Sequence, residues 1–239
     1  MEEIHTLKNI IPYEVLQTIQ NMTPEEIAER DREIERADAE AAARAKQERY
    51  EKSGAPRRYW RESLDTYKLT NDEQRKAAAA VAELINKVNA GKKHILVLLG
   101  AVGTGKTHLC CAAIREIGGQ YMTAAEMVEE IRHAKAFDAE ATEKQIIERY
   151  ANNKLSVMDE VGRGINATDE KYMIYSYVNA IYNMNGSAII TSNFSKSDFL
   201  KYVGAAVTDR LVEYGSIIEI GGESYRKELR RSNDERPKC

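Results

Sequence analysis

The sequence His94-Ile-Leu-Val-Leu-Leu-Gly-Ala-Val-Gly-Thr-Gly-Lys-Thr107 joins an apolar run to a glycine-rich loop. The apolar run is typical of a buried parallel strand, and the loop fits the pattern G-x-x-x-x-G-K-[ST]. Residues 108–117 then predict a helix that ends at the glycine pair 118–119. A strand, a glycine loop and a helix in this order direct backbone N–H groups and the positive helix end at one place, which suits a phosphate.

Two side chains of the loop add to this phosphate site. Lys106 offers a mobile charge to the β- and γ-phosphates of a nucleotide, and Thr107 offers a hydroxyl to Mg²⁺. We therefore expect ATP and Mg²⁺ as cofactors. The residues that we expect to bind the nucleotide here are Gly100, Ala101, Val102, Gly103, Thr104, Gly105, Lys106, Thr107 and His108.

The bulk composition is that of a globular protein. The chain has 239 residues, 43% of them hydrophobic, which allows one domain of ordinary size with an appendage. The longest apolar run, residues 95–99, is far shorter than the roughly 20 residues of a membrane helix. Because the chain opens on an acidic Met1-Glu-Glu-Ile segment, it has no secretory signal pattern, and we expect a cytoplasmic protein without a membrane partner.

Neither the charge nor the cysteines define a second kind of site. The net charge of −3 does not demand nucleic acid, and each basic cluster (residues 57–61, 196–201 and 226–231) is more often a solvated face than a DNA contact. Cys110 and Cys111 are adjacent and Cys239 ends the sequence, a spacing that suits neither a zinc site nor a disulfide framework. The adjacent pair is typical of a core helix.

Residues 1–52 predict a separate helical domain. Apolar residues recur at helical spacing from Ile4 to Ile19, and Thr23-Pro-Glu-Glu26 is a strong helix start with capping-box chemistry. The segment that follows is rich in Ala, Glu, Arg and Lys, and its apolar positions are sparse. Such a helix has little to bury alone. It either crosses solvent as a spacer or binds a partner.

Residues 53–70 predict a linker that docks on the following domain. Ser53-Gly-Ala-Pro56 interrupts the helical pattern. Tyr59, Trp60 and Tyr67 then lie among arginines, a mixture that can stack nucleic-acid bases. We favour packing against the next domain, because it is the commoner outcome for such aromatic residues.

Residues 71–239 predict an α/β domain. Thr70-Asn-Asp-Glu73 opens a helix with capping-box chemistry, in which Thr70 is the cap. This helix ends before Gly91, and strands and helices alternate from there. This alternation indicates a parallel sheet with helices on both faces and right-handed crossovers. The predicted strands are residues 94–99, 120–123, 155–158, 187–191 and 216–220.

The ends of two later strands supply the acidic half of a nucleotide site. Strand 155–158 leads into Asp159-Glu160, and strand ends converge on the ligand crevice in this class of fold. Asp159 can hold Mg²⁺ through water, and Glu160 can activate the attacking water. Asn193, after the run 188–191, lies beside Asp159 if the two strands are neighbours, and it can then reach that water or the γ-phosphate. Ser156, a hydroxyl within an apolar strand, has no explanation at this level.

Two arginines follow that can stabilise transition-state charge. Arg210 lies in Val207-Thr-Asp-Arg-Leu211, and Arg226 in Ser224-Tyr-Arg226. A guanidinium can act on its own subunit's nucleotide or on that of a neighbour. Taken singly, both are more often surface arginines in local ion pairs.

In this order, GAVGTGKT, LSVMDE, IITSN, VTDRL and SYR resemble the DnaC-type bacterial replicative helicase loaders, a branch of the AAA+ ATPases. The resemblance covers residue 53 to the end. It implies a sheet of strand order 5-1-4-3-2, a small helical domain in front and no full helical lid. It also implies Walker A residues at 100–107, a Walker B pair at Asp159 and Glu160, and sensor positions at Asn193 and Arg226.

The resemblance also implies partners. ATP-bound subunits would associate, with Arg210 as an arginine finger in the next subunit's site, hold single-stranded DNA, and grip a hexameric replicative helicase through the N-terminal helices. Two alternatives stay open. One is an IstB-like transposition helper ATPase, which shares almost the same core and would engage a transposase. The other is a nucleotide-binding adaptor without significant turnover.

Overall fold

The computed structural model describes residues 22–134, 141–164, 166–184, 186–222 and 224–225. The helical positions predicted between Ile4 and Ile19, the residues Arg226 and Cys239, and the basic cluster at 226–231 lie outside these described residues. Contacts divide the chain into two compact units, residues 1–45 and 46–239. Each unit is described by itself.

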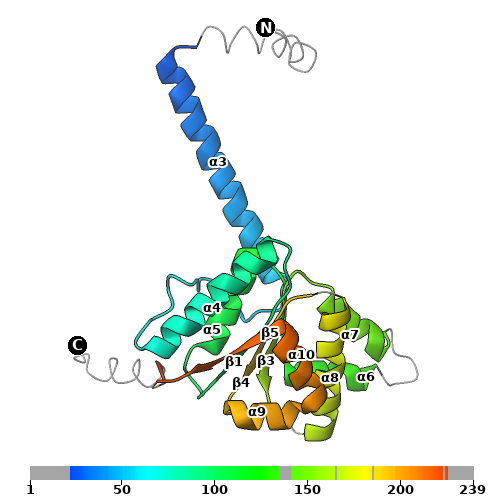
Figure 1. Cartoon of the computed structure of the whole chain (residues 1–239). Coiled ribbons are helices and arrows are strands. Elements are labelled where there is room, and N and C mark those ends of the chain that lie inside the picture. Colours follow the sequence, from blue (N-terminus) through cyan, green and yellow to red (C-terminus); the bar gives the residue numbers. More distant parts are fainter. Residues whose placement is uncertain (1–21, 135–140, 165, 185, 223, 226–239) are drawn as a thin grey trace, which may run out of the picture. The chain divides into compact units, whose positions relative to one another are not determined.

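Helix α3 (Pro24–Glu51) begins where the sequence predicts (Figure 1). The Thr23 N–H donates to Glu26 Oε2 at 2.7 Å, and the Glu26 N–H donates to Thr23 Oγ1 at 3.3 Å, so the predicted capping box is confirmed. Ile27 and Ile34 are exposed along the helix. Tyr50, in its last turn, is buried within the second unit's core.

The second unit is built on a five-stranded parallel sheet in the order β2-β3-β4-β1-β5, which confirms the predicted order 5-1-4-3-2. The strands lie close to their predicted positions, except that β3 continues through both acidic residues and has a register irregularity between Met158 and Val161. Their bounds are β1 Ile95–Gly100, β2 Gln120–Thr123, β3 Ser156–Val161, β4 Ala188–Ser192 and β5 Gly215–Ile220.

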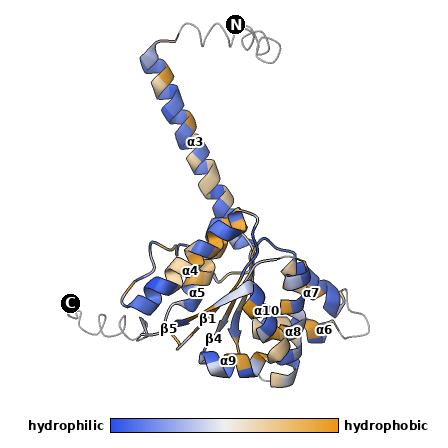
Figure 2. Ribbon diagram, viewed as in Figure 1, coloured by the Kyte–Doolittle hydropathy of each residue, from blue (hydrophilic) through white to orange (hydrophobic). Residues whose placement is uncertain are grey.

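Helices cover both faces of this sheet (Figures 1 and 2). Alternate residues of each strand face opposite layers, so Leu96 and Leu98 of β1 join one core cluster while Val97 and Leu99 join the other. The first cluster lies under α4 (Asp72–Asn89) and α5 (Lys106–Ile117). The second lies under α6 Ala124–His133, α7 Glu143–Ala151, α8 Ala167–Asn183, α9 Lys196–Val203 and α10 Ala205–Tyr214.

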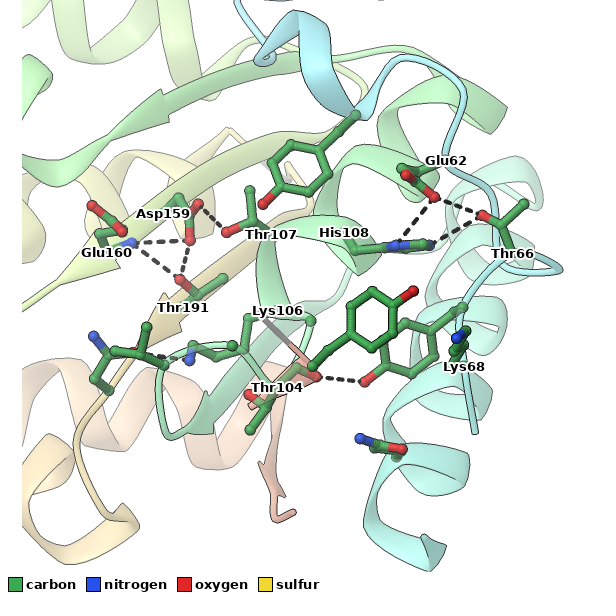
Figure 3. A pocket seen from close by; sticks show the side chains of 18 of the residues that line it. Glu62, Thr66, Lys68, Thr104, Lys106, Thr107, His108, Asp159, Glu160 and Thr191 are labelled. Carbon is green, nitrogen blue, oxygen red and sulfur yellow. Dashed lines mark hydrogen bonds and ion pairs between the residues drawn. The ribbon is translucent and has the colours of Figure 1, made fainter. Parts of the chain in front are cut away.

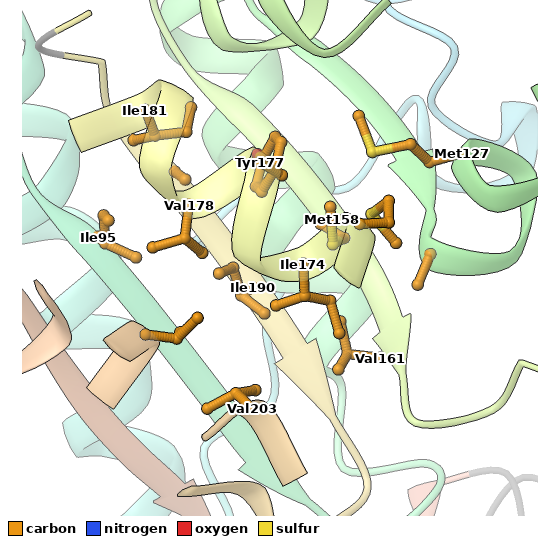
Figure 4. Close-up of a cluster of buried hydrophobic side chains, with 14 of the residues drawn as sticks. Ile95, Met127, Met158, Val161, Ile174, Tyr177, Val178, Ile181, Ile190 and Val203 are labelled. Atoms are coloured by element: carbon orange, nitrogen blue, oxygen red, sulfur yellow. The ribbon is translucent and has the colours of Figure 1, made fainter. Parts of the chain in front are cut away.

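Ser156, which the sequence left unexplained, has a buried partner. Tyr177 of α8 donates its hydroxyl to Ser156 Oγ at 2.6 Å, and both residues are fully buried. Figure 4 shows Tyr177 among the apolar side chains of this layer. The serine therefore satisfies a tyrosine hydroxyl that packing places inside the core.

The start of α4 corrects the predicted cap. Asn71, not Thr70, is the N-cap: its Oδ1 accepts from the Gln74 N–H at 2.8 Å, and Gln74 Oε1 accepts from the Thr70 N–H at 2.7 Å. Asparagine caps at least as well as threonine, so the cap moves forward by one residue. The Gln74 side chain accepts from the residue before the cap, so it does not close a capping box at Asn71.

Within the described residues, no helix has both the length and the apolar character needed to cross a membrane.

Candidate nucleotide-binding site

The loop between β1 and α5 has the backbone of an anion cradle. Gly103 (φ 89°) and Gly105 (φ 90°) adopt left-handed conformations that favour glycine. A Cβ at Gly105 would lie 2.4 Å from Tyr67 Cε2, so a side chain has no room there. Because Gly105 is the N-cap of α5, the N–H groups of the first helical turn have no acceptor within the helix. They are available to a phosphate.

Lys106 has its ammonium group inside this loop. Its Nζ donates to the carbonyls of Gly100 (2.6 Å) and Ala101 (2.9 Å) and to Asn193 Oδ1 (2.9 Å), and the residue is 8% exposed. Burial lowers the pKa of Lys106, and nearby Asp159 opposes that shift. All three acceptors are neutral, so the charge of Lys106 remains available to an anion. Asn193, predicted beside Asp159, contacts this lysine.

Asp159 is surrounded by hydroxyl donors (Figure 3). Thr107 Oγ1 donates to its Oδ2 at 2.8 Å, Thr191 Oγ1 donates to its Oδ1, and the Glu160 N–H donates to Oδ1 at 3.1 Å. A fourth donor is Tyr121, whose hydroxyl is 2.6 Å from Oδ2. The carboxylate is 2% exposed, so these donors stabilise a buried charge.

The donor set fits Mg²⁺ bound together with a nucleotide. Mg²⁺ prefers oxygen ligands, keeps several waters and uses one or two protein groups beside substrate phosphates. Thr107 and Asp159 supply such oxygens next to the anion cradle. Over the described part of the chain, no group of three or more His, Cys, Asp and Glu side chains could hold a metal by itself. Thr107 and Asp159 would hold Mg²⁺ only together with the phosphates of a nucleotide.

Glu160 has an unusual backbone. Its φ is 62°, the one positive value for a non-glycine among the described residues, and it lies within the irregular part of β3. Its carboxylate accepts from Arg163 Nη1 at 2.6 Å. The fully buried Glu170 holds the following loop by accepting the N–H groups of Gly162 (2.6 Å) and Gly164 (3.1 Å). Neither Arg163 nor Glu170 was predicted as part of the site.

The segment after α3 packs beside the loop. The Tyr67 hydroxyl donates to the Thr104 carbonyl at 2.8 Å, and its ring meets the His108 ring edge-on with centroids 5.3 Å apart. His108 Nε2 is 2.8 Å from the Ser63 carbonyl. The His108 side chain thus lies against this segment, and its backbone N–H is the part that faces an anion. The pocket is also lined by residues that we did not predict, namely Tyr59, Glu62, Thr66, Lys68, Thr70, Gln74 and Tyr225.

Arg210 lies outside this pocket. From α10 its Nη2 donates to Asn179 Oδ1 of α8 at 2.6 Å, and its guanidinium lies over the rings of Tyr175 (5.6 Å) and Tyr182 (5.5 Å). Within the described parts of the chain it forms no ion pair, and its buried Nε has no hydrogen-bond partner. The structure therefore brings Lys106, Thr107, Asp159 and Asn193 together and leaves Arg210 apart from them.

The fold and site define a class of protein, the AAA+ ATP-binding proteins. A solved structure of the DnaC helicase loader aligns with a TM-score of 0.61 at 23% identity, covering 70% of this chain and 100% of that one. The replication initiator DnaA bound to AMPPCP and single-stranded DNA aligns with a TM-score of 0.58 at 20% identity, covering 75% and 57%. At these identities the likeness shows the fold.

Within this class the chain belongs to the family described as IstB-like ATP binding protein, whose model matches residues 20–233. Its relatives are of two kinds. An insertion sequence IS5376 putative ATP-binding protein from Geobacillus stearothermophilus is 27% identical, over 75% of this chain and 73% of that protein. A replicative helicase loader DnaC from Buchnera aphidicola subsp. Baizongia pistaciae is 25% identical, over 74% of each.

Proposed function

We propose that the protein is an ATP-hydrolysing switch that helps to place a hexameric replicative helicase on single-stranded DNA. The observation that carries the ATPase part is the meeting of Lys106, Thr107, Asp159 and Asn193 at the carboxyl ends of neighbouring strands. Binding and hydrolysis would then be the two states of the switch, in the cytoplasm where replication takes place.

Each residue has a definite task in this proposal. The loop N–H groups and Lys106 bind the β- and γ-phosphates, and Thr107 and Asp159 hold Mg²⁺, which neutralises charge on the phosphate oxygens. Glu160 orients the attacking water and accepts its proton, after turning from Arg163. Asn193 helps to position the γ-phosphate. Arg210 of an adjoining subunit completes the site, and Arg226, outside the described residues, has the sensor position.

The helicase as effector is supported by the DnaC relatives and by α3. Three DnaC relatives are 24–25% identical over 74–75% of the chain. Helix α3 is charged and leaves Ile27 and Ile34 exposed, as a helix that binds a partner through a narrow apolar stripe does. We therefore propose that residues 1–52 contact the helicase.

A second candidate is a transposition helper ATPase. Insertion-sequence proteins are among the relatives at similar identity: besides that of IS5376, the IS21 putative ATP-binding protein of Pseudomonas aeruginosa is 27% identical over 64% of this chain. In that case the same ATPase domain would act on a transposase. The two candidates differ in the protein that they engage, not in the nucleotide chemistry.

Replacing Glu160 by glutamine is expected to preserve nucleotide binding and to lower kcat by about 100-fold or more, since an amide cannot accept the proton from water. Phosphate release and equilibrium binding of a fluorescent ATP analogue measure the two effects. Glu129→Gln changes an exposed glutamate of α6 in the same way and serves as the control. Undiminished hydrolysis would refute the role of Glu160 as the base, and a wild type without turnover would favour the adaptor alternative.

Breaking the ion pair between Arg163 and Glu160 is expected to raise basal turnover. The pair is half exposed, so it holds the glutamate with less than about 1 kcal/mol, and Arg163→Gln should increase kcat by about 1.5- to 5-fold. Arg132→Gln is the matched control, because Arg132 pairs with Asp169 at similar exposure outside the nucleotide pocket. A decrease in kcat for Arg163→Gln alone would mean that the arginine assists the reaction.

The two effectors can be separated by affinity capture with the full chain. Glu160→Gln loaded with ATP is the bait in an extract of the source organism, and Lys106→Ala is the bait without bound nucleotide. Nucleotide-dependent recovery of the hexameric replicative helicase supports the loader. Recovery of a transposase with no helicase overturns the loader in favour of the transposition helper.

A further inference from the structure

The buried carboxylate of Asp159 receives one hydrogen bond from outside the nucleotide pocket. The Tyr121 hydroxyl donates to Oδ2 at 2.6 Å, and this is the oxygen that also accepts from Thr107. Tyr121 is 7% exposed and is not among the residues that line the pocket. It therefore has no direct access to a nucleotide, and it acts on the site through Asp159 alone.

The sheet register explains why a tyrosine can make this contact. Thr123 of β2 lies opposite Asp159 of β3, and Tyr121 lies opposite Val157. Because side chains alternate along a strand, Tyr121, Val157 and Asp159 share the face that α5 covers. Tyr121 lies opposite Val157, two residues before Asp159 on the same face of the sheet. Only a long side chain with a donor at its end reaches the carboxylate from there. Among standard residues, a neutral phenol meets this need without adding a charge.

Tyr121 is itself held from behind by the segment that follows α3. Its backbone N–H donates to the Ser53 carbonyl at 2.7 Å, on the free edge of β2. Gly54 (φ 81°) lets that segment approach closely, since a Cβ there would lie 2.7 Å from the Tyr121 carbonyl oxygen. Ser53 Oγ donates in turn to the Tyr50 carbonyl at 2.6 Å, at the end of α3. The backbone of β2 at Tyr121 is thus fixed by the segment that follows α3, on the edge of β2 away from β3.

The Tyr121 hydroxyl is the donor in this contact and takes up one lone pair of Oδ2. Together with Thr107 on the same oxygen and Thr191 on Oδ1, this contact fixes the carboxylate rotation, with Oδ2 shared between Tyr121 of β2 and Thr107 of the phosphate loop.

From this geometry we propose that Tyr121 is a positioning residue, whose hydroxyl aims the Asp159 carboxylate at the Mg²⁺ that accompanies the nucleotide. The inference rests on the proposed binding of Mg²⁺ and ATP by this site. Its consequence is specific: Tyr121 contributes to the part of nucleotide affinity that depends on Mg²⁺ and not to the part that does not.

Tyr121→Phe tests the proposal in the full-length protein. Binding of mant-AMPPNP, a fluorescent non-hydrolysable ATP analogue, is titrated with Mg²⁺ and repeated in EDTA. We expect the Mg²⁺ concentration for half-maximal affinity gain to rise by about 10- to 100-fold, the effect of losing one hydrogen bond to a charged group. Affinity in EDTA should stay within about 2-fold of wild type, because the loop and Lys106 are unchanged.

Tyr177→Phe is the matched control. This change also removes a buried tyrosine hydroxyl that donates to a residue of β3. The acceptor, Ser156, does not line the nucleotide pocket. It should lower the melting temperature and leave the Mg²⁺ titration unchanged. Equal titrations for wild type, Tyr121→Phe and Tyr177→Phe would overturn the proposal.

A second replacement keeps the test decisive if the phenylalanine variant does not fold. With 4-aminophenylalanine at position 121, an aniline N–H stands where the hydroxyl donated, and the wild-type Mg²⁺ titration should be retained. If this variant folds but shows a weakened Mg²⁺ response, donation to Asp159 is not the role of Tyr121. A wild-type protein that binds mant-AMPPNP equally well with and without Mg²⁺ would instead overturn the proposed metal site, and this inference with it.

Discussion

Lys106→Ala is expected to reduce the affinity for ATP by at least about 100-fold, the largest effect on binding of any single change in the loop. The loop N–H groups remain, but the γ-phosphate loses the cation that reaches it. The fold should survive the change. Lys106 is 8% exposed and its ammonium bonds to neutral acceptors alone, so the replacement takes away a buried charge together with its hydrogen bonds.

Equilibrium binding of the fluorescent ATP analogue measures this effect, and thermal unfolding checks the fold. Lys154→Ala is a close control, since Lys154 also donates to an asparagine oxygen, Asn89 Oδ1 at 3.0 Å, outside the nucleotide pocket. Its nucleotide affinity should equal that of the wild type. If Lys106→Ala binds nucleotide as tightly as Lys154→Ala, the glycine loop does not bind phosphate in the way proposed.

Most of the fold could be predicted because its determinants are local in the sequence. A strand of a parallel sheet is buried on both faces, so β1 and β4 appear as continuous apolar runs. The ends of α5 follow from Gly105 and Gly118, and the start of α3 follows from its capping box. The cap of α4 was misplaced by one residue, because Thr70 and Asn71 are both good caps and only the contact with Gln74 separates them.

The site residues, like the fold, could be predicted where local sequence determines their position, and not where it depends on tertiary packing. Lys106, Thr107, Asp159 and Asn193 could be predicted because parallel strands bring their carboxyl ends to one edge of the sheet. Tyr121 was not predicted, although the expected strand order already made β2 and β3 neighbours, because its contact with Asp159 also depends on the register between these strands and on the reach of the ring. The pairing of Ser156 with Tyr177 likewise depends on how α8 packs. Strand order combined with alternation of faces is the signal that points to Tyr121.

The proposed role of Arg210 as an arginine finger leads to the second large expected effect. Arg210→Ala is expected to lower ATP turnover by about 100-fold or more, because a guanidinium at the γ-phosphate stabilises charge that develops in the transition state. Within one chain this residue contacts Asn179, Tyr175 and Tyr182 and does not line the nucleotide pocket. Arg210 has no ion-pair partner among the described residues and lies outside the nucleotide pocket of its own chain. This placement fits an arginine that acts on a neighbouring subunit.

Mixing two inactive variants distinguishes this role from a structural one. An Arg210→Ala subunit has an intact Glu160, and a Glu160→Gln subunit has an intact Arg210. Hydrolysis should therefore return at the nucleotide site of an Arg210→Ala subunit whose neighbour is a Glu160→Gln subunit. Random pairing of equal amounts should restore about a quarter of the wild-type rate, since one interface in four joins the two intact groups. Glu160→Gln mixed with Lys106→Ala should stay inactive. Each of these variants lacks a residue of its own nucleotide site, and Arg210 from a neighbouring subunit does not replace that residue. If the first mixture also stays inactive although both variants fold and associate, Arg210 acts within its own subunit or only supports the packing of α8 against α10.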